Sequence, residues 1–131
     1  MCYFCIVKEE MKKFLTIATV NDLVRLAPEK VVYISADGNY CHIMQADGTS
    51  RLVTIQLGKI SDLIEEQGVE TADFEFMRVG KSLLINKYYV THINIQQQQL
   101  VLSDAKTFTH TVSASRDALK RIKEDLERQN Q

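Results

Sequence analysis

Two Ala-Asp-Gly turns, at residues 36–38 and 46–48, constrain the fold of this 131-residue chain more than any other feature. Asp-Gly between two runs of β-forming residues is a strong short-range signal for a hairpin of antiparallel strands. Residues 40–44, between the two turns, form one short β-rich run. The two turns, ten residues apart, therefore predict an antiparallel meander rather than βαβ units.

Short β-rich runs fill most of the remaining chain, which predicts a mostly β protein. The four glutamines at residues 96–99 are expected to form a polar hairpin loop, because the run is too short for a prion-like tract. The predicted strands are residues 14–20, 23–26, 31–34, 40–44, 51–53, 83–85, 90–95, 100–102 and 108–112.

Helical spacing of apolar residues occurs in two places. Over residues 57–64 it predicts a short central helix that Thr54 caps and Gly68 ends. A second helix is predicted from the N-cap Ser115 to Leu126, with one apolar stripe that docks on the sheets. The expected fold class is therefore mostly β, with stacked antiparallel β-sheets, one central short helix and a C-terminal helix.

The length of the chain is that of one domain. Met11 looks like an alternative start, so residues 1–10 are expected to be an N-terminal extension outside a single domain over residues 11–131. The chain has no run of ~20 apolar residues and no secretory signal at its N-terminus. Its three cysteines, an odd number, favour a reducing compartment. We therefore expect a cytoplasmic protein without a membrane partner.

Residues suited to catalysis or metal binding do not form a pattern. His42, His92 and His110 fall on predicted strands without a Ser or Cys nucleophile signature. Cys2 and Cys5 have the spacing of half a zinc site, but no second pair follows at a usable distance, which favours free thiols. We expect no enzyme activity, no metal, no cofactor and no small-molecule substrate.

The net charge of −1 conceals an asymmetry along the chain. Residues 1–75 carry 7 Lys/Arg and 12 Asp/Glu, a charge of −5, whereas residues 76–131 carry 9 and 5, a charge of +4. Such an asymmetry points weakly toward an anionic partner. On composition alone, a solvated surface explains these basic residues slightly better than an anionic partner does.

The letters GKS at residues 80–82 also end a Walker A loop, which would bind a nucleotide. That loop requires a glycine at position 75, where this chain has Glu75, and a helix directly after the serine. Residues 83–90 are instead rich in β-formers and are typical of a strand. The nucleotide-binding hypothesis is therefore rejected, and the basic cluster lies between two strands.

Three stretches resemble the LytTR family, the DNA-binding domain of LytR/AlgR-type bacterial regulators. They are VVYISADGNY at residues 31–40, FMRVGKSLLIN at residues 76–86 and VSASR at residues 112–116. Their order and spacing match the family over residues 14–126. The resemblance implies a mostly β fold whose loops, rather than a recognition helix, enter successive major grooves. Family members are commonly fused to a receiver domain, and the resemblance here is to a standalone domain.

The resemblance also implies the residues that meet DNA. Lys81 matches a position that contacts a base or a phosphate, and Arg116 matches an arginine that reads bases. Residues 39–41 lie where the family places a third DNA-facing loop. Arg78, Ser82 and Asn86 match positions that support the central turn as much as they touch DNA. With the basic residues nearby, the candidate DNA-binding residues are Lys81, Arg116, Asn39, Tyr40, Cys41, Arg78, Ser82, Asn86, Lys87, Lys106 and Lys120.

Two positions depart from the family pattern, because Gly80 replaces the usual histidine and Leu83 replaces the usual aromatic residue. The expected function is sequence-specific binding of double-stranded DNA by a bacterial transcriptional regulator. Paired imperfect repeats are the expected site, and a homodimer on DNA would suit them. The alternative is a β-rich protein-interaction module that has lost DNA binding, which Gly80 and the acidic first half favour.

Overall fold

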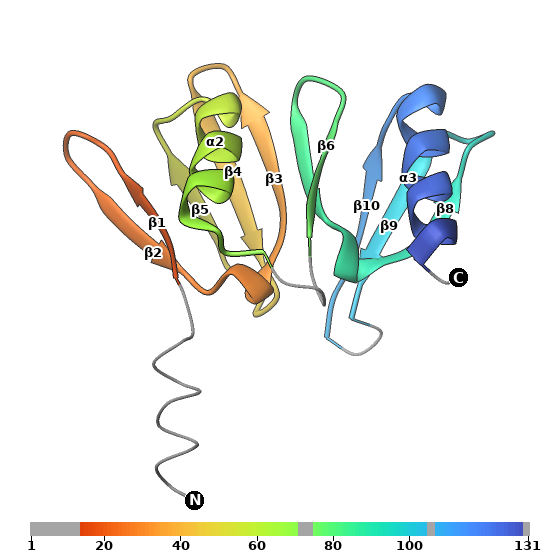
Figure 1. Ribbon diagram of the computed structural model, residues 1–131, viewed down its shortest axis with the longest axis horizontal. Coiled ribbons are helices and arrows are strands. Elements are labelled where there is room, and N and C mark those ends of the chain that lie inside the picture. The colour runs from red at the N-terminus through yellow and green to blue at the C-terminus, as the bar shows by residue number, and fades with distance from the viewer. Residues whose placement is uncertain (1–13, 71–74, 105–106, 130–131) are drawn as a thin grey trace, which may run out of the picture.

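The computed structural model describes residues 14–70, 75–104 and 107–129 (Figure 1). Within these residues, the strands are β1 (Leu15–Ala18), β2 (Leu23–Leu26), β3 (Val31–Asp37), β4 (Tyr40–Gln45), β5 (Ser50–Val53), β6 (Phe76–Val79), β7 (Leu83–Asn86), β8 (Val90–Asn94), β9 (Gln99–Ser103) and β10 (Thr109–Ser113). The α-helices are α2 (Leu57–Gln67) and α3 (Arg116–Gln129), and the 3₁₀ helices are η1 (Pro28–Lys30) and η2 (Lys87–Tyr89). The expected mostly β fold is confirmed.

A five-stranded antiparallel sheet with the order β5-β4-β3-β7-β6 forms the centre of the molecule. The two Asp-Gly turns join β3 to β4 and β4 to β5, so the predicted meander is confirmed. Gly38 and Gly48 have φ angles of +63° and +90°. Glycine adopts this left-handed region at little cost, which explains its place in both turns.

The central sheet is buried on both faces. Ile34 and Leu84 pack on one face, with α2 and the β1–β2 hairpin. Tyr33, Leu83 and Ile85 pack on the other face, with the β10-β9-β8 sheet and α3. All four residues of β7 are buried as a result. The chain therefore forms stacked layers around two hydrophobic cores.

Two of the three predicted helix-end signals are confirmed. Gly68 ends α2 in the left-handed conformation, and the Ser115 hydroxyl accepts a hydrogen bond from the Ala118 amide at 3.2 Å, as predicted. The prediction that Thr54 caps α2 is wrong, because the helix begins at Leu57 after Gln56. Burial of Leu57 against the central sheet sets this start, and residues 54–56 still belong to the connection from β5.

The strand expected over residues 83–90 is interrupted. The Asn86 side chain donates to the Val31 carbonyl at 2.9 Å and accepts from the Tyr88 amide at 3.1 Å. Asparagine side chains that bond to nearby backbone compete with a strand ladder. Residues 87–89 therefore form η2, and the chain passes from the central sheet into β8 of the three-stranded sheet.

The expected N-terminal extension, residues 1–10, lies outside the described residues, as do Met11, Cys2 and Cys5. In the part of the chain that is described, no helix is both long enough and apolar enough to cross a bilayer.

Candidate nucleic-acid interface

Three connections from distant parts of the chain lie along one edge of the molecule, at the top of Figure 1. They are residues 38–39 between β3 and β4, residues 80–82 between β6 and β7, and residues 114–115 between β10 and α3. We call this surface the loop edge. Both α-helices also begin there and run away from it (Figure 1). Because helix N-termini present free amides and positive dipole ends, this edge favours an anionic partner.

The β6–β7 turn presents Lys81 and Ser82, both exposed, at the loop edge. The Arg78 guanidinium donates to the Lys81 carbonyl at 3.1 Å, which braces the turn from below. The Ser82 carbonyl accepts from the Ala36 amide at 2.8 Å and ties the turn to β3. Lys81 thus has no ion-pair partner among the described residues, and its backbone is held in place.

Gly80, which replaces the usual histidine of the family signature, has a φ angle of +67°. A Cβ added there would meet nothing within 4 Å, so the space itself would admit a side chain. The left-handed conformation nevertheless disfavours most L-residues. The tight turn therefore explains the glycine, and Lys81 is the side chain that this turn projects.

The β10–α3 junction presents Arg116 at the first position of α3, where the Ser115 cap fixes the start of the helix. The Arg116 guanidinium also reaches the Gln96 carbonyl in the β8–β9 loop at 3.4 Å. Lys120 is exposed one turn further along α3. The last helix therefore brings two cations to or near the loop edge.

The β3–β4 turn presents Asn39 and Tyr40, both exposed, but not Cys41. Side chains alternate along β4, so Cys41 lies in the first hydrophobic core with none of its surface exposed. Burial raises the pKa of its thiol, against the nearby charge of Arg78. The expectation that Cys41 meets DNA is therefore corrected, and Cys41 is a core residue.

Asn86 and Lys87 are likewise buried. The expectation that these two residues meet DNA is therefore corrected as well. Asn86 serves the turn into η2, as described above. Lys87 forms ion pairs with Asp125 of α3 at 2.5 Å and with Glu75 at 3.4 Å. Burial works against its charge, but these hydrogen bonds and carboxylates outweigh that effect, and the pKa of Lys87 is raised. Both residues hold the layers together at the end away from the loop edge.

The structure thus gathers most of the predicted site into one surface. Arg78, Lys81 and Ser82 share one turn, and Asn39 and Tyr40 lie on the neighbouring turn. Lys106 lies outside the described residues. Sequence reasoning missed that α2 begins at this edge, with Lys59 and no acidic residue in its first turn. The position of the α2 start follows from the strand order, because β5, which leads into α2, lies beside β4 in the sheet.

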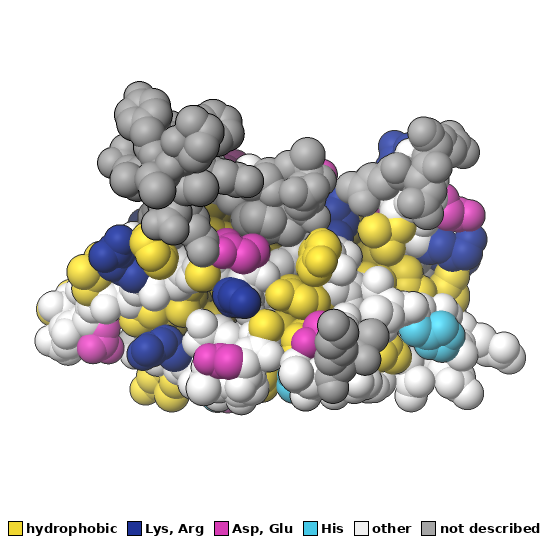
Figure 2. All heavy atoms as spheres, turned by 90° about the horizontal axis from the view of Figure 1, so that it is seen from below, with side chains coloured by type: hydrophobic (Ala, Val, Ile, Leu, Met, Phe, Trp, Pro, Cys, Tyr) yellow, Lys and Arg dark blue, Asp and Glu magenta, His cyan; other side chains and the backbone are white. Residues whose placement is uncertain are grey.

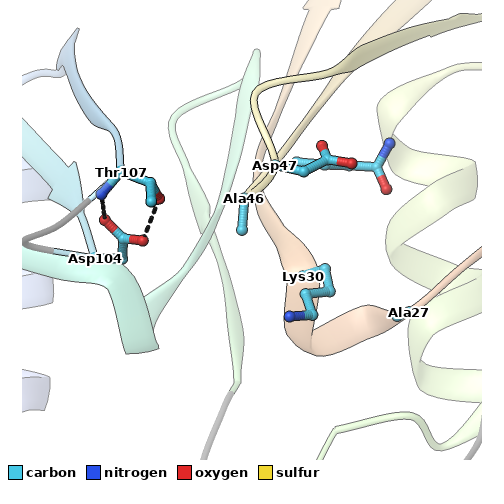
Figure 3. A pocket seen from close by; sticks show the side chains of 7 residues that line it. Ala27, Lys30, Ala46, Asp47, Asp104 and Thr107 are labelled. Carbon is cyan, nitrogen blue, oxygen red and sulfur yellow. Dashed lines mark hydrogen bonds between the residues drawn. The ribbon is translucent and has the colours of Figure 1, made fainter.

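The opposite end of the molecule has a different character. Figure 2, seen from below, shows Lys and Arg interspersed with Asp and Glu among apolar side chains. An open hollow of about 320 Å³ lies there, and its lining is Ala27, Lys30, Gln45, Ala46, Asp47, Asp104 and Thr107 (Figure 3).

The two carboxylates that line this hollow already have hydrogen-bond partners. Asp104 accepts from the Thr107 amide at 2.7 Å, as Figure 3 shows. Asp47 accepts from the amide and the hydroxyl of Thr49 at 2.9 and 2.6 Å, and these bonds lower its pKa. Among its described lining residues, the hollow therefore presents no convergent set of free polar groups.

A β scaffold with basic loops and two helix N-termini at one edge suits a nucleic-acid-binding domain. The family model described as the LytTr DNA-binding domain matches residues 21–127, so the chain belongs to the LytTR family of DNA-binding domains. The resemblance inferred from the three sequence signatures is thereby confirmed.

One similar solved structure is the LytTr DNA-binding domain of a putative methyl-accepting/DNA response regulator from Bacillus cereus. It shares 16% identity with this chain at a TM-score of 0.57, and the match covers 88% of this chain and 97% of that one. At this identity the likeness establishes the fold. A search among curated proteins finds no match.

Proposed function

We propose that this protein binds specific sites in double-stranded DNA as a bacterial transcriptional regulator. The main support for the proposal is that the three sequence signatures each place residues at the loop edge. Lys81, in the β6–β7 turn, and Arg116, at the start of α3, are 35 residues apart in the chain, yet both are exposed at that edge. Loops on a rigid sheet are common carriers of binding residues.

Lys81 and Arg116 are suited to different contacts. Lys81 is a compact charge on a flexible stem beside a glycine, which suits a phosphate. Arg116 carries a planar fork that donates two parallel hydrogen bonds, and its helix start is fixed by Ser115. Such a fork matches the O6 and N7 acceptors of guanine in the major groove. Lys81 therefore positions the domain, and Arg116 reads a base.

The remaining exposed residues support this assignment. Asn39 and Tyr40 meet the DNA from the third loop, with Asn39 able to donate to a phosphate or a base edge. Arg78 keeps the Lys81 turn in shape through its bond to the turn carbonyl. Successive major grooves on one face of the duplex then accept successive loops. Two such domains, as a homodimer, would occupy paired imperfect repeats.

A second function, binding of another protein, is favoured by a different surface. The β1–β2 hairpin exposes Val20 at 99% and Leu23 at 65% of their surface, away from the two hydrophobic cores. Exposed apolar side chains of this kind occur at protein contacts. The two functions differ in what they require of the loop edge, because only DNA binding needs Lys81 and Arg116.

Selection of bound sequences from random duplexes tests the proposal. A shared sequence motif is the expected result, followed by a binding constant that falls steeply as salt rises from low to physiological concentration. Phosphate neutralisation releases counterions and causes that dependence. No enrichment, or a flat salt response, would reject DNA binding and leave the protein-interaction alternative.

A further inference from the structure

The β8–β9 loop, which holds the run of glutamines, joins the loop edge beside Arg116. Gln99 pairs with Ser113 in the β9–β10 register, so residues 96–98 project beyond the end of β10. The Ala114 amide donates to the Gln98 carbonyl at 3.2 Å, and Arg116 reaches the Gln96 carbonyl. Two backbone contacts thus fix this loop to the junction that carries the proposed base-reading arginine.

Two glutamine side chains in the β8–β9 loop make no hydrogen bond within the described residues. The Gln97 carboxamide accepts a hydrogen bond from the Asn94 side chain at 3.3 Å. Gln96 and Gln98 are exposed, and their carboxamides have no hydrogen-bond partner among residues 14–70, 75–104 and 107–129. Each free carboxamide offers one acceptor oxygen and two N–H donors.

The backbone of Gln98 has a conformation that is unusual for a residue other than glycine. Its φ angle is +57°, and no other non-glycine residue in the described part of the chain has a positive φ. The bond from the Gln98 amide to the Ile95 carbonyl, at 3.2 Å, helps to hold this conformation. Glycine or asparagine would suit it better, and strained backbone conformations cluster at functional sites.

We propose that Gln96 and Gln98 read adenine in the major groove, next to the base that Arg116 contacts. This inference rests on the proposed DNA-binding function. A glutamine carboxamide donates to adenine N7 and accepts from adenine N6, a pair of contacts that no other base offers in the same arrangement. The junction with α3 therefore carries two kinds of reader, a guanidinium for guanine and carboxamides for adenine.

The test uses the sequence that wild-type protein selects from random duplexes. In matched duplexes, each adenine adjacent to the Arg116-dependent base is replaced in turn by 7-deazaadenine, which lacks the N7 acceptor. Wild-type affinity should fall roughly 5- to 160-fold at one of these adenines, the range expected for a bidentate base contact. The variants are Gln96→Ala, which keeps the backbone carbonyl, and Gln98→Gly, which suits the positive φ and so keeps the fold.

At least one of these variants should bind the natural duplex more weakly by about the same factor and show no further loss on the 7-deazaadenine duplex. Gln97→Ala is the matched control in the same loop, and it should respond to 7-deazaadenine as the wild type does. Selected sites without an adenine beside the Arg116-dependent base would overturn the inference. So would two variants that both remain sensitive to 7-deazaadenine.

The two proposals fail in different ways. Wild-type protein that selects no sequence refutes DNA recognition itself, and the reading of adenine with it. Wild-type protein that binds its site in an Arg116-dependent manner, but with Gln96→Ala and Gln98→Gly unchanged, refutes only the adenine contact.

Discussion

Asn86 closes the central family signature, and its replacement by alanine should destabilise the protein without altering its contact with DNA. The side chain is fully buried and makes two hydrogen bonds, to the Val31 carbonyl and from the Tyr88 amide. Each bond contributes about 1 kcal/mol net, and a buried partner left unsatisfied costs about 1–3 kcal/mol. Asn86→Ala should therefore lower the free energy of unfolding by roughly 2–5 kcal/mol.

For a domain of this size, such a loss corresponds to a fall in melting temperature on the order of 10 °C. The chain contains no Trp and five Tyr, so tyrosine fluorescence and circular dichroism in urea are suitable probes. Asn21→Ala, at an exposed turn, is the control and should stay within about 0.5 kcal/mol of wild type. DNA affinity is measured at low temperature, where the variant remains folded.

At that temperature Asn86→Ala should bind the selected duplex within about twofold of wild type, since surface contacts of the loop edge are retained. A variant that keeps its melting temperature but loses DNA binding would refute this reasoning. Asn86 would then be a DNA ligand, as the family signature first suggested, and its burial in the isolated protein would have to change on binding.

Four further predictions concern charge and the chain terminus. Lys81→Ala should weaken binding to the selected and the scrambled duplex alike. It should also reduce the slope of log K against log salt by about one, as measured by titration at two salt concentrations. Arg116→Ala should cost roughly 1–3 kcal/mol on the selected site and much less on scrambled DNA, and equal losses on both would contradict base reading. The hydrogen bond from Lys87 lowers the pKa of Asp125. The ion pair therefore stabilises the fold fully above the unfolded-state pKa of ~3.9, and this stabilisation is lost as pH falls through the folded-state pKa. Urea midpoints should therefore drop in acid, and Asp125→Asn should lower the neutral midpoint and reduce that drop. Deletion of residues 1–10 should leave melting temperature and DNA affinity unchanged, because no predicted strand, cap or metal pair depends on them.

Local sequence signals determined most of the secondary structure. The Asp-Gly turns at Gly38 and Gly48, the Gly68 helix end and the Ser115 cap each involve interactions over a few residues, so the letters around them are sufficient. The family signatures added the fold class, because their order and spacing are characteristic. Thr54 was one exception, since the helix start depended on which residue packs against the sheet. The strand expected over residues 83–90 was another, because η2 interrupts it.

Tertiary structure decided which of the signature residues face outward. In β7 every residue is buried, because layers cover both faces of the central sheet, so alternation carries no information about exposure there. Asn86 could therefore be recognised as an interior residue only from the packed layers. The burial of Cys41 likewise depends on which face of β4 the first hydrophobic core covers. Lys87 in particular is a basic residue in a basic stretch, and only its two carboxylate partners, 12 and 38 residues away, reveal its structural role.

Tertiary structure also decided which segments of the chain meet at the loop edge. The sequence alone identified Lys81 and Arg116 as candidates and treated residues 96–99 as a polar loop. Strand pairing between β9 and β10 then placed that loop against Arg116, through hydrogen bonds between residues 16 and 20 positions apart. Contacts at such separations depend on the register and stacking of whole sheets, which no short stretch of sequence encodes.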